Sequence, residues 1–370
     1  MNVRNLRKVE WWIPICAIIL CGIGLIALFS ASYDSGLDEF KKQAIWMGVS
    51  IGIMIATMLI DYKILIKLSP ILYGIAIISI IAVLFTKPIS GARSWFVIGN
   101  DLFSFQPAEM AKVFVILFLA YVISIIQKNN RNEINKFSKL LIILATIAVP
   151  VLLIIIEPDY GTATAYIVAF LVMIFVAGID KKYIITAFAV VIIAVPLIYN
   201  FVLPQHAKSR IDTFLHPESD PRGTGYNILQ SKLAIGAGEI TGMGVLNGNQ
   251  TQLGYLYPKT TDFIFSVIGE EMGFVVACSV IILNVVIITK SIQVAKGIKD
   301  DAGAYVAAGI AGVFLFHTLE NIGMTMGLLP ITGVPLLFVS YGGSSMMTSF
   351  LCLGVLLNIS SQRKNGMFNK

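Results

Sequence analysis

The sequence predicts an all-helical integral membrane protein, organised as a single polytopic domain of residues 1–370 with about ten transmembrane helices. Of its 370 residues, 57% are hydrophobic and 13% are charged, and the mean hydropathy is +0.83. A soluble domain carries roughly 25% charged residues, so much of this surface must face lipid. Several apolar stretches also approach the roughly 20 residues that a helix needs to cross a bilayer.

Ten such stretches follow one another along the chain. The first comes after a basic segment, as in a signal peptide, but it is long and more spans follow, so we expect an uncleaved helix. Three of the later stretches are interrupted by polar side chains. In order, the ten predicted spans are 12–30, 44–60, 71–85, 108–126, 140–156, 162–177, 183–199, 263–288, 302–326 and 345–359.

The distribution of basic residues sets the predicted orientation. If the amino terminus lies in the cytoplasm and the chain crosses ten times, the short cytoplasmic loops carry most of the 27 basic residues, as the positive-inside rule requires. Both termini are therefore expected in the cytoplasm. The loop residues are Arg4, Arg7, Lys8, Lys63, Lys67, Lys128, Arg131, Lys136, Lys139, Lys181, Lys182, Lys290, Lys296, Lys299, Arg363, Lys364 and Lys370.

Charge and cysteine content exclude several functions. The net charge of +6 follows mainly from this topology signal, and no patterned basic patch suggests a nucleic-acid partner. All four cysteines, Cys16, Cys21, Cys278 and Cys352, fall inside predicted spans without metal-ligand spacing. We expect them to be small packing residues, with no disulfide and no metal site.

Two segments on the predicted outer side are more than connectors. Residues 200–261, between spans seven and eight, form a loop too long for a simple turn. Their glycine-rich stretches and an amphipathic piece near 226–233 predict an ordered extracytoplasmic cap. Residues 327–343, before span ten, are too apolar and too rich in glycine and proline to float in water. We expect a re-entrant segment whose backbone is covered by protein.

Ionisable residues inside spans are costly and tend to mark function. Glu109 and Lys112 are three residues apart at the outer start of span four, so they share one helix face. Pro107 precedes them where the first turn of a helix tolerates proline. The pair either neutralises itself and locks two helices together or takes part in function, and the sequence leaves both open.

A polar stripe is expected at the start of span eight. Asp262, Ser266 and Glu270 follow i, i+4, i+8 spacing, which places Glu270 roughly 12 Å deeper than Asp262 at 1.5 Å per residue. Asp262 taken alone could instead be a helix N-cap. For Glu270 and Glu271 we expect hydrogen bonds to other helices.

Two further polar groups have more than one interpretation. His317, Glu320 and Asn321 on span nine are too few for a zinc-type site, so we expect interhelical hydrogen bonds. Glu157 and Asp159 lie two residues apart in a short outer turn. They could bind a cation, or they could form a tight turn in which Asp159 caps the next helix.

Five blocks, in order along the chain, resemble motifs of the SEDS family, the bacterial membrane proteins of shape, elongation, division and sporulation. The resemblance spans nearly the whole chain. The rod-shape branch fits better than the division branch, judged by residues 320–324 and 212–217. The blocks are GARSW (91–95) with FSFQPAEMAK (103–112), EPDYGTA (157–163), GYNILQSKLAIG (225–236), TDFIFSVIGEE (261–271) and ENIGMTMGLLPITGVPLLFVSYGGSS (320–345).

The resemblance implies a peptidoglycan glycosyltransferase. Such an enzyme polymerises lipid II, a disaccharide-pentapeptide on undecaprenyl diphosphate, into glycan strands at the outer face of the bacterial cytoplasmic membrane, for cell elongation and shape. It works within membrane lipid, beside a class B penicillin-binding protein that cross-links the strands. The family's catalytic aspartate falls on Asp262, which would accept the proton of the acceptor hydroxyl in an inverting reaction.

The departing diphosphate requires positive charge near the site. Lys112, Arg93, Arg210 and Lys232 are the candidates, and a divalent cation (Mg²⁺ or Mn²⁺) could share the task, although no metal ligands are predicted in the protein. The complete predicted substrate-binding set is Lys112, Glu109, Arg93, Trp95, Arg210, Gln230, Ser231, Lys232, Tyr341 and Ser344.

One departure from the family pattern bears on activity. Where the family shows a carboxylate and a histidine just before its TDFIF block, this chain reads Leu256-Tyr257-Pro258-Lys259-Thr260. Two alternatives to the enzyme stay open, the first from the ten spans with buried charges and the second from this departure. One is a lipid II flippase, although the chain shows no internal repeat typical of transporters. The other is a non-catalytic activator of a penicillin-binding protein.

Overall fold

The computed structural model describes residues 9–88, 93–98, 103–201, 205–221 and 223–363. Five of the basic loop residues (Arg4, Arg7, Lys8, Lys364 and Lys370) and the Gly91-Ala92 pair lie outside these ranges. Within them, regular structure is helical except for one hairpin, in which β1 (Phe96–Ile98) pairs antiparallel with β2 (Phe103–Phe105). The predicted helical membrane fold is confirmed.

Ten helices in the described part of the chain are long and apolar enough to cross a membrane, as expected. Each coincides with one predicted span, and polar caps extend some beyond their apolar stretch. Asp61, for example, accepts a hydrogen bond from the backbone N–H of Lys63 and starts a helix early. The ten are α2 (Trp12–Ala31), α3 (Asp38–Leu59), α4 (Tyr62–Val83), α5 (Pro107–Ile126), α6 (Phe137–Ile156), α7 (Tyr160–Ala177), α8 (Lys181–Phe201), α12 (Ile264–Gly297), α13 (Asp301–Thr325) and α14 (Gly343–Ser361).

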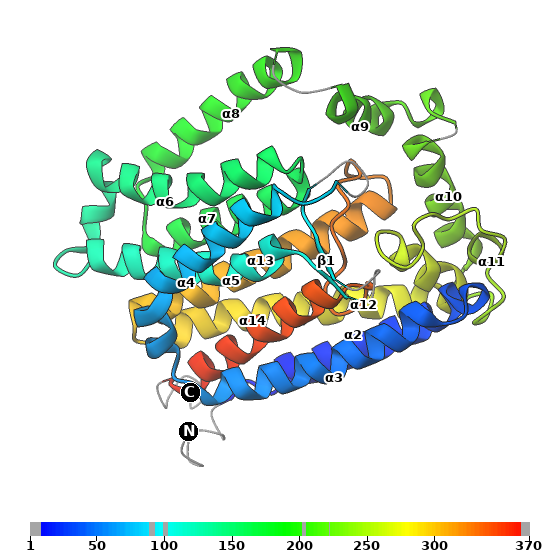
Figure 1. Cartoon of the computed structure of the whole chain (residues 1–370), viewed down its shortest axis with the longest axis horizontal. Helices are drawn as coiled ribbons and strands as arrows, with labels where there is room; N and C mark the ends of the chain where they lie inside the picture. The colour runs from blue at the N-terminus through cyan, green and yellow to red at the C-terminus, as the bar shows by residue number, and fades with distance from the viewer. Residues whose placement is uncertain (1–8, 89–92, 99–102, 202–204, 222, 364–370) are drawn as a thin grey trace.

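Helices α13 and α14 form the centre of the bundle. Of their most apolar stretches, 89% and 83% of residues are buried, and α13 packs on α7 and α12 while α14 packs on α3 (Figure 1). Small residues permit this close approach. A Cβ at Gly309 would lie 2.8 Å from a methyl group of Ile116, and one at Gly312 would lie 2.9 Å from the Cα of Ala169.

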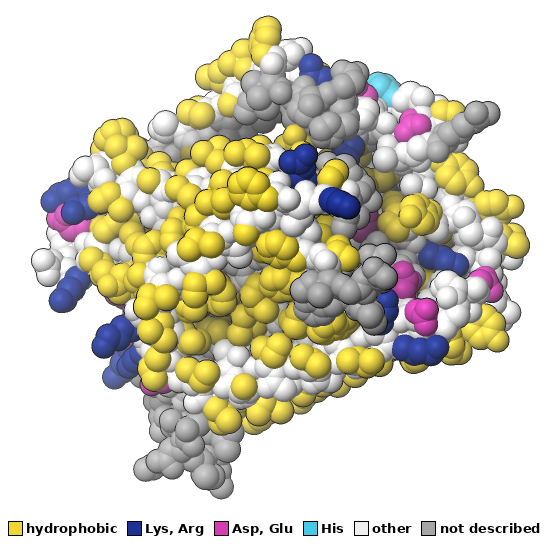
Figure 2. Space-filling model, in the orientation of Figure 1, with side chains coloured by type: hydrophobic (Ala, Val, Ile, Leu, Met, Phe, Trp, Pro, Cys, Tyr) yellow, Lys and Arg dark blue, Asp and Glu magenta, His cyan; other side chains and the backbone are white. Residues whose placement is uncertain are grey.

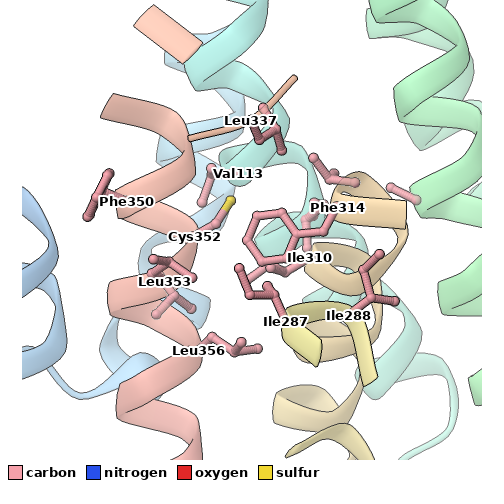
Figure 3. Close-up of a cluster of buried hydrophobic side chains, with 14 of the residues drawn as sticks. Val113, Ile287, Ile288, Ile310, Phe314, Leu337, Phe350, Cys352, Leu353 and Leu356 are labelled. Carbon is pink, nitrogen blue, oxygen red and sulfur yellow. The ribbon is translucent and has the colours of Figure 1, made fainter. Parts of the chain in front are cut away.

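Four helices contribute to the apolar core drawn in Figure 3. Val113 of α5, Ile287 of α12, Phe314 of α13 and Leu353 of α14 are all buried there. The outside of the bundle is apolar as well. Figure 2 shows hydrophobic side chains across the middle of the visible face and most Lys and Arg side chains toward its ends. Such a belt is suited to lipid contact.

The described residues of the 200–261 segment form an ordered cap, as predicted. They contain α9 (Gln205–Leu215), η3 (Pro217–Ser219), α10 (Thr224–Ala237) and α11 (Asn249–Gln252). Figure 1 shows α10 and α11 at one end of the bundle, and α2 begins and α14 ends at the other. We call the end that carries α10 and α11 the cap end.

Helix α12 is interrupted at Gly273, whose φ of +77° and ψ of −177° are not helical. The backbone groups freed by the break must find partners inside the protein, and the cap supplies them. The Met243 N–H donates to the Glu270 carbonyl at 2.9 Å, and the Phe274 N–H donates to the Glu239 carbonyl at 2.9 Å. The break therefore ties the cap to the bundle.

The predicted polar stripe of span eight is wrong in one respect. The helix begins at Ile264, and Phe263 is its N-cap residue without a side-chain cap, so Asp262 lies outside the helix and is not the N-cap. Ser266 does lie on the helix, and its hydroxyl is 2.6 Å from that of Ser231 on α10. Residues 258–263 form a turn and not a helix. The i, i+4 pattern therefore does not apply to Asp262, the first residue of the predicted stripe.

The expected role of the two glutamates in α12 is confirmed. Glu270 accepts from the backbone N–H groups of Gln250 at 2.6 Å and Thr251 at 3.0 Å, at the start of α11. Glu271 accepts from the hydroxyl of Ser30 on α2 at 2.6 Å. Both carboxylates thus stabilise the packing of the cap rather than lining a stripe.

Residues 327–342 carry no helix, and residues 336–340 are buried by protein, whereas Leu328 and Gly333 are exposed. The ring centroid of Phe338 lies 5.7 Å from that of Phe314 and 5.6 Å from that of Phe350. A Cβ at Gly24 of α2 would lie only 2.6 Å from the carbonyl oxygen of Val339. The cover by protein is observed for the second half of the segment, and the re-entrant course in a bilayer stays a prediction.

We expect Gly238→Ala to destabilise the protein. A Cβ at Gly238 would overlap the carbonyl oxygen of Gly269 on α12, and overpacking of this kind costs about 1–3 kcal/mol. Gly236→Ala is the matched control, because a Cβ there meets nothing within 4 Å. Midpoints of thermal unfolding in detergent measure the difference. Equal midpoints for the two variants would contradict this close contact between the cap and α12.

Candidate functional site

Asp262 lies in a turn at the cap end whose backbone is fixed by hydrogen bonds. The Tyr341 N–H donates to the Thr260 carbonyl at 2.9 Å, and the Ser340 hydroxyl donates to the Thr261 carbonyl at 2.7 Å. Asn321 of α13 donates through its side-chain nitrogen to the carbonyl of Asp262 itself, at 3.0 Å. Three donors from two other parts of the chain therefore set the position of this turn.

The carboxylate of Asp262 is half-buried and has a cation nearby. Burial raises its pKa to about 6, while the side chain of Thr261 and the charge of Arg210 on α9 act in the opposite direction. A Cβ at Gly333 would lie 3.7 Å from Asp262 Oδ2, so the absence of a side chain at Gly333 leaves room beside the carboxylate. This carboxylate is suited to accept a proton from a bound hydroxyl group.

The 327–343 segment forms one wall beside Asp262. Asn321 also donates to the Val334 carbonyl at 2.9 Å, and the Thr332 hydroxyl donates to Glu320 at 2.7 Å. A Cβ at Gly161, on α7, would lie 2.5 Å from a methyl group of Val334. The start of α7, the end of α13 and the turn before α12 thus meet at this point.

A buried polar cluster joins α5 to α13. Lys112 Nζ lies 2.8 Å from Glu109 Oε1 and 2.9 Å from His317 Nε2. An ammonium group only donates, so Nε2 accepts and the His317 Nδ1–H donates to the Pro335 carbonyl at 3.0 Å. The self-neutralising Glu109–Lys112 pair is observed, and the interhelical role expected for His317 is confirmed. Glu320 and Asn321 instead bond to non-helical segments, Glu320 to Thr332 and Asn321 to Asp262 and Val334.

The short turn between α6 and α7 contains the predicted cap. Asp159 accepts from the Thr162 N–H at 3.0 Å, so its N-cap role is confirmed. It also accepts from the side-chain nitrogen of Gln106 at 2.7 Å, and the Gln106 N–H donates to Ser344 Oγ at 3.0 Å. In the part of the chain that the structure describes, no three His, Cys, Asp or Glu side chains come together as a metal site.

The predicted substrate-binding residues divide by exposure. Arg93, Arg210 and Lys232 are exposed, and Trp95, Gln230 and Tyr341 are half-buried. Lys232 lies close to Gly327, because a Cβ at that glycine would overlap its Cε. Arg210 is close enough to affect the pKa of Asp262. These side chains are available to a substrate at the cap end.

The other four members of the set are buried. Glu109, Lys112, Ser231 and Ser344 are each 3% exposed or less, and every one already has a polar partner. Ser231, for example, donates to the Thr325 carbonyl at 2.6 Å. Their burial and internal bonds favour a positioning role for these four, and their contact with substrate stays a prediction.

Three residues that position the site were absent from the predicted set. Asn321 was expected only to join helices, yet it holds both segments that flank Asp262. Gln106 and Asp159 link the starts of α5, α7 and α14. The sequence did offer a signal for Gln106: it is a polar residue directly before Pro107, at the predicted start of a span.

Lys112→Met should destabilise the protein by about 3–5 kcal/mol, because removing one partner of a buried ion pair leaves the other charge uncompensated. The double variant Glu109→Gln, Lys112→Met should recover much of that loss, since it removes both charges. Unfolding of the two variants and the wild type in detergent measures both effects. A double variant that is less stable than the single one would show that the charge pair is not the cause.

Comparison with known proteins identifies relatives over almost the whole chain. The family model described as a cell cycle protein of the FtsW, RodA and SpoVE type matches residues 10–365. The peptidoglycan glycosyltransferase MrdB of Escherichia coli K12 is 35% identical over 92% of this chain and 90% of its own length. Stage V sporulation protein E of Bacillus subtilis is 34% identical over 94% of this chain and 95% of its own.

Solved structures share the fold. A chain from a peptidoglycan synthase complex that coordinates polymerization and crosslinking aligns over 97% of this chain and 99% of its own, with a TM-score of 0.81 and 24% identity. The rod shape determining protein RodA of Thermus thermophilus covers 97% of this chain and 98% of its own, with a TM-score of 0.71 and 24% identity. On the family match and the sequence identities, this chain belongs to the SEDS family of FtsW, RodA and SpoVE proteins.

Proposed function

We propose that this chain is a peptidoglycan glycosyltransferase that polymerises lipid II at the outer face of the bacterial cytoplasmic membrane. The observation that carries the proposal is Asp262, a half-buried carboxylate held in a fixed turn at the cap end with Arg210 nearby. Relatives named as peptidoglycan glycosyltransferases support it. In this proposal the cap faces outward, both termini are cytoplasmic, and the product serves cell elongation and shape.

Asp262 acts as the general base. The acceptor hydroxyl oxygen forms a bond to the anomeric carbon of the donor sugar, the bond from that carbon to the diphosphate breaks, and the hydroxyl proton passes to Asp262. A single displacement of this kind inverts the anomeric carbon and requires no protein nucleophile. With a pKa of about 6, the carboxylate is ionised at neutral pH yet more basic than an ordinary aspartate, as a general base should be.

The leaving group is undecaprenyl diphosphate, and its growing charge requires cations. Arg210, Lys232 and Arg93 are exposed at the cap end and supply them. Mg²⁺ or Mn²⁺ could assist, and it would be held mainly by the diphosphate itself, since Mg²⁺ is commonly bound through substrate phosphates with few protein ligands. The proposal does not assign this role to Lys112, because its ammonium group is buried and paired with Glu109.

A membrane partner fits the same proposal. The polyprenyl tail of lipid II would stay in the bilayer against the apolar exterior of the bundle while its head group reaches Asp262. The structural neighbour from a complex of polymerization and crosslinking supports a cross-linking partner, which we take to be a class B penicillin-binding protein. Its identity would decide whether the chain serves elongation, division or sporulation.

Two observations weigh against the alternatives. A flippase would be expected to carry paired broken helices near the midplane, whereas the break at Gly273 is bound tightly by the cap. A non-catalytic activator would not need the turn that holds Asp262. In the segment that departs from the family pattern, Lys259 Nζ donates to the Thr251 carbonyl at 2.8 Å, which supports a turn that is still ordered.

Asp262→Asn should abolish glycan synthesis from purified lipid II in detergent, because removal of a general base costs about 10²–10⁴-fold. Asp38→Asn is the matched control, since the Asp38 side chain at the start of α3 is 76% exposed and pairs with Lys41. Gel analysis of the polymer measures both. Polymer formed by Asp262→Asn at the wild-type rate would remove Asp262 from the base role. No polymer from the wild type with its partner would favour the flippase or the activator.

The rate of polymerisation should fall as the pH drops below about 6, because only the ionised form of Asp262 accepts a proton and burial raises its pKa to about 6. Arg210→Gln removes a charge that lowers this pKa, so the acid limb of the pH profile should move to higher pH. Lys208→Gln, on the same helix, is the control, because that ammonium donates to the Asn200 carbonyl instead. An acid limb that Arg210→Gln leaves in place would contradict this assignment.

A further inference from the structure

The carboxyl group of Glu157 is buried without a partner. It follows the last residue of α6 and is 1% exposed, and neither of its oxygens makes a hydrogen bond of acceptable geometry. Burying an ionised carboxylate without partners is very costly, and an unsatisfied buried polar group requires a specific explanation. The mechanism above makes no use of this residue.

Burial and a neighbouring carboxylate favour the neutral form of Glu157, and Ser94 opposes them. Asp159 places a second carboxylate two residues away, and burial together with Asp159 raises the pKa of Glu157 to about 8. From the segment that leads into β1, Ser94 approaches closely enough to lower this pKa. From α7, Tyr166 lies close enough to interact electrostatically with Glu157, but its hydroxyl donates to the Ala108 carbonyl at 2.6 Å. The described residues that face Glu157 include no cation.

The cation that acts on the neighbouring Asp159 is already paired. Lys112 of α5 is bonded to Glu109 and His317, and it acts on Asp159 together with Glu109. One ammonium group therefore serves a region that holds the carboxyl groups of Glu109, Asp159 and Glu157. Keeping a proton on the last of these lowers the uncompensated charge in the interior.

Ser94, which lies beside Glu157, is also buried without a hydrogen-bond partner. It is 2% exposed, and its hydroxyl oxygen also lacks a hydrogen bond of acceptable geometry. A neutral carboxylic acid can donate one hydrogen bond and accept others, so a small movement of either side chain satisfies both groups at once. Ser94 lies between Arg93 and Trp95, two residues proposed to contact substrate.

We propose that Glu157 is a positioning residue that works as a neutral acid: its protonated carboxyl group pairs with Ser94 and holds the segment of Arg93 and Trp95 against the turn that begins α7. The role rests on the proposed function. It also connects to Asp262 through packing, since Gly161 at the start of α7 lies against Val334, and Gly333 is next to the Asp262 carboxylate.

Loss of the proton would place a charge in a site that cannot solvate it. The turn would then have to open to water, and the segment of Arg93 and Trp95 would lose its support. Deprotonation of Glu157 displaces the segment of Arg93 and Trp95 but does not directly move Asp262. It should therefore raise KM for lipid II more than it lowers kcat. Activity should therefore decline on the alkaline side, through the titration of Glu157.

The test compares the pH profiles of wild type, Glu157→Gln, Glu157→Ala and the control Glu218→Gln, with purified lipid II in detergent. Glu218 is exposed on η3. Wild type and the control should lose about tenfold in kcat/KM from the plateau to pH 9, as one group of pKa about 8 implies. Glu157→Gln, which mimics the neutral acid, should keep the plateau value and lose the alkaline limb. Glu157→Ala should be weaker than Glu157→Gln at every pH.

Three outcomes overturn the proposal: an alkaline limb that Glu157→Gln retains, a Glu157→Gln variant that is inactive at neutral pH, or a wild type without decline up to pH 9. Thermal unfolding provides a measurement that does not depend on activity. The folded pKa lies above the ordinary value of 4.5, so wild type should lose stability relative to Glu157→Gln as the pH rises from about 5 to about 8. If the wild type makes no polymer, the proposed function fails, and the stability difference alone then decides whether Glu157 is protonated. In that case, a stability difference between wild type and Glu157→Gln that does not change with pH would overturn the proposal for Glu157.

Discussion

Asn321 donates from one side-chain nitrogen to two backbone carbonyls, those of Asp262 at 3.0 Å and Val334 at 2.9 Å. These carbonyls belong to two non-helical segments at the site, residues 258–263 and 327–342. Inside a membrane protein each unpaired backbone group costs several kcal/mol, so irregular chain persists there only where side chains supply donors. The same requirement explains why backbone groups of the cap form hydrogen bonds with the backbone groups of α12 that are left unpaired at the Gly273 break. The site is built where helical geometry ends and substitute donors are present.

Burial separates positioning from binding at the cap end. Lys112 is 2% exposed and already bonded to Glu109 and His317, so using it to bind an anion would first break a buried pair. Arg210 and Lys232 are exposed and lose little when a diphosphate approaches. The buried ammonium group of Lys112 therefore stays in a fixed ion pair with Glu109. The exposed side chains of Arg210 and Lys232 are the ones left to bind the substrate.

The sequence predicts the spans well because lipid imposes length and apolar composition on every crossing segment. It also predicts the cap of α7 by Asp159, because capping is local. The break at Gly273 could not be predicted, since the groups that stabilise it lie about thirty residues away, around Glu239 and Met243. Asp262 was placed on the helix for the same reason: its position outside α12 depends on donors from Asn321 and Ser340, which no local pattern reveals.

The position of Asp262 outside α12 has a chemical consequence. A carboxylate in the first turn of a helix or at its N-cap is stabilised as the anion by the helix dipole and by free N–H groups, which would weaken it as a base. Asp262 instead precedes the N-cap residue, and its backbone carbonyl, not its carboxylate, takes the Asn321 donor. Burial can then raise its pKa, with only Thr261 and Arg210 opposing. Glu157 is less exposed, and among the described residues no cation acts on it, so its pKa is raised further. Environment alone thus separates two carboxyl groups of similar chemistry into a base and a neutral acid.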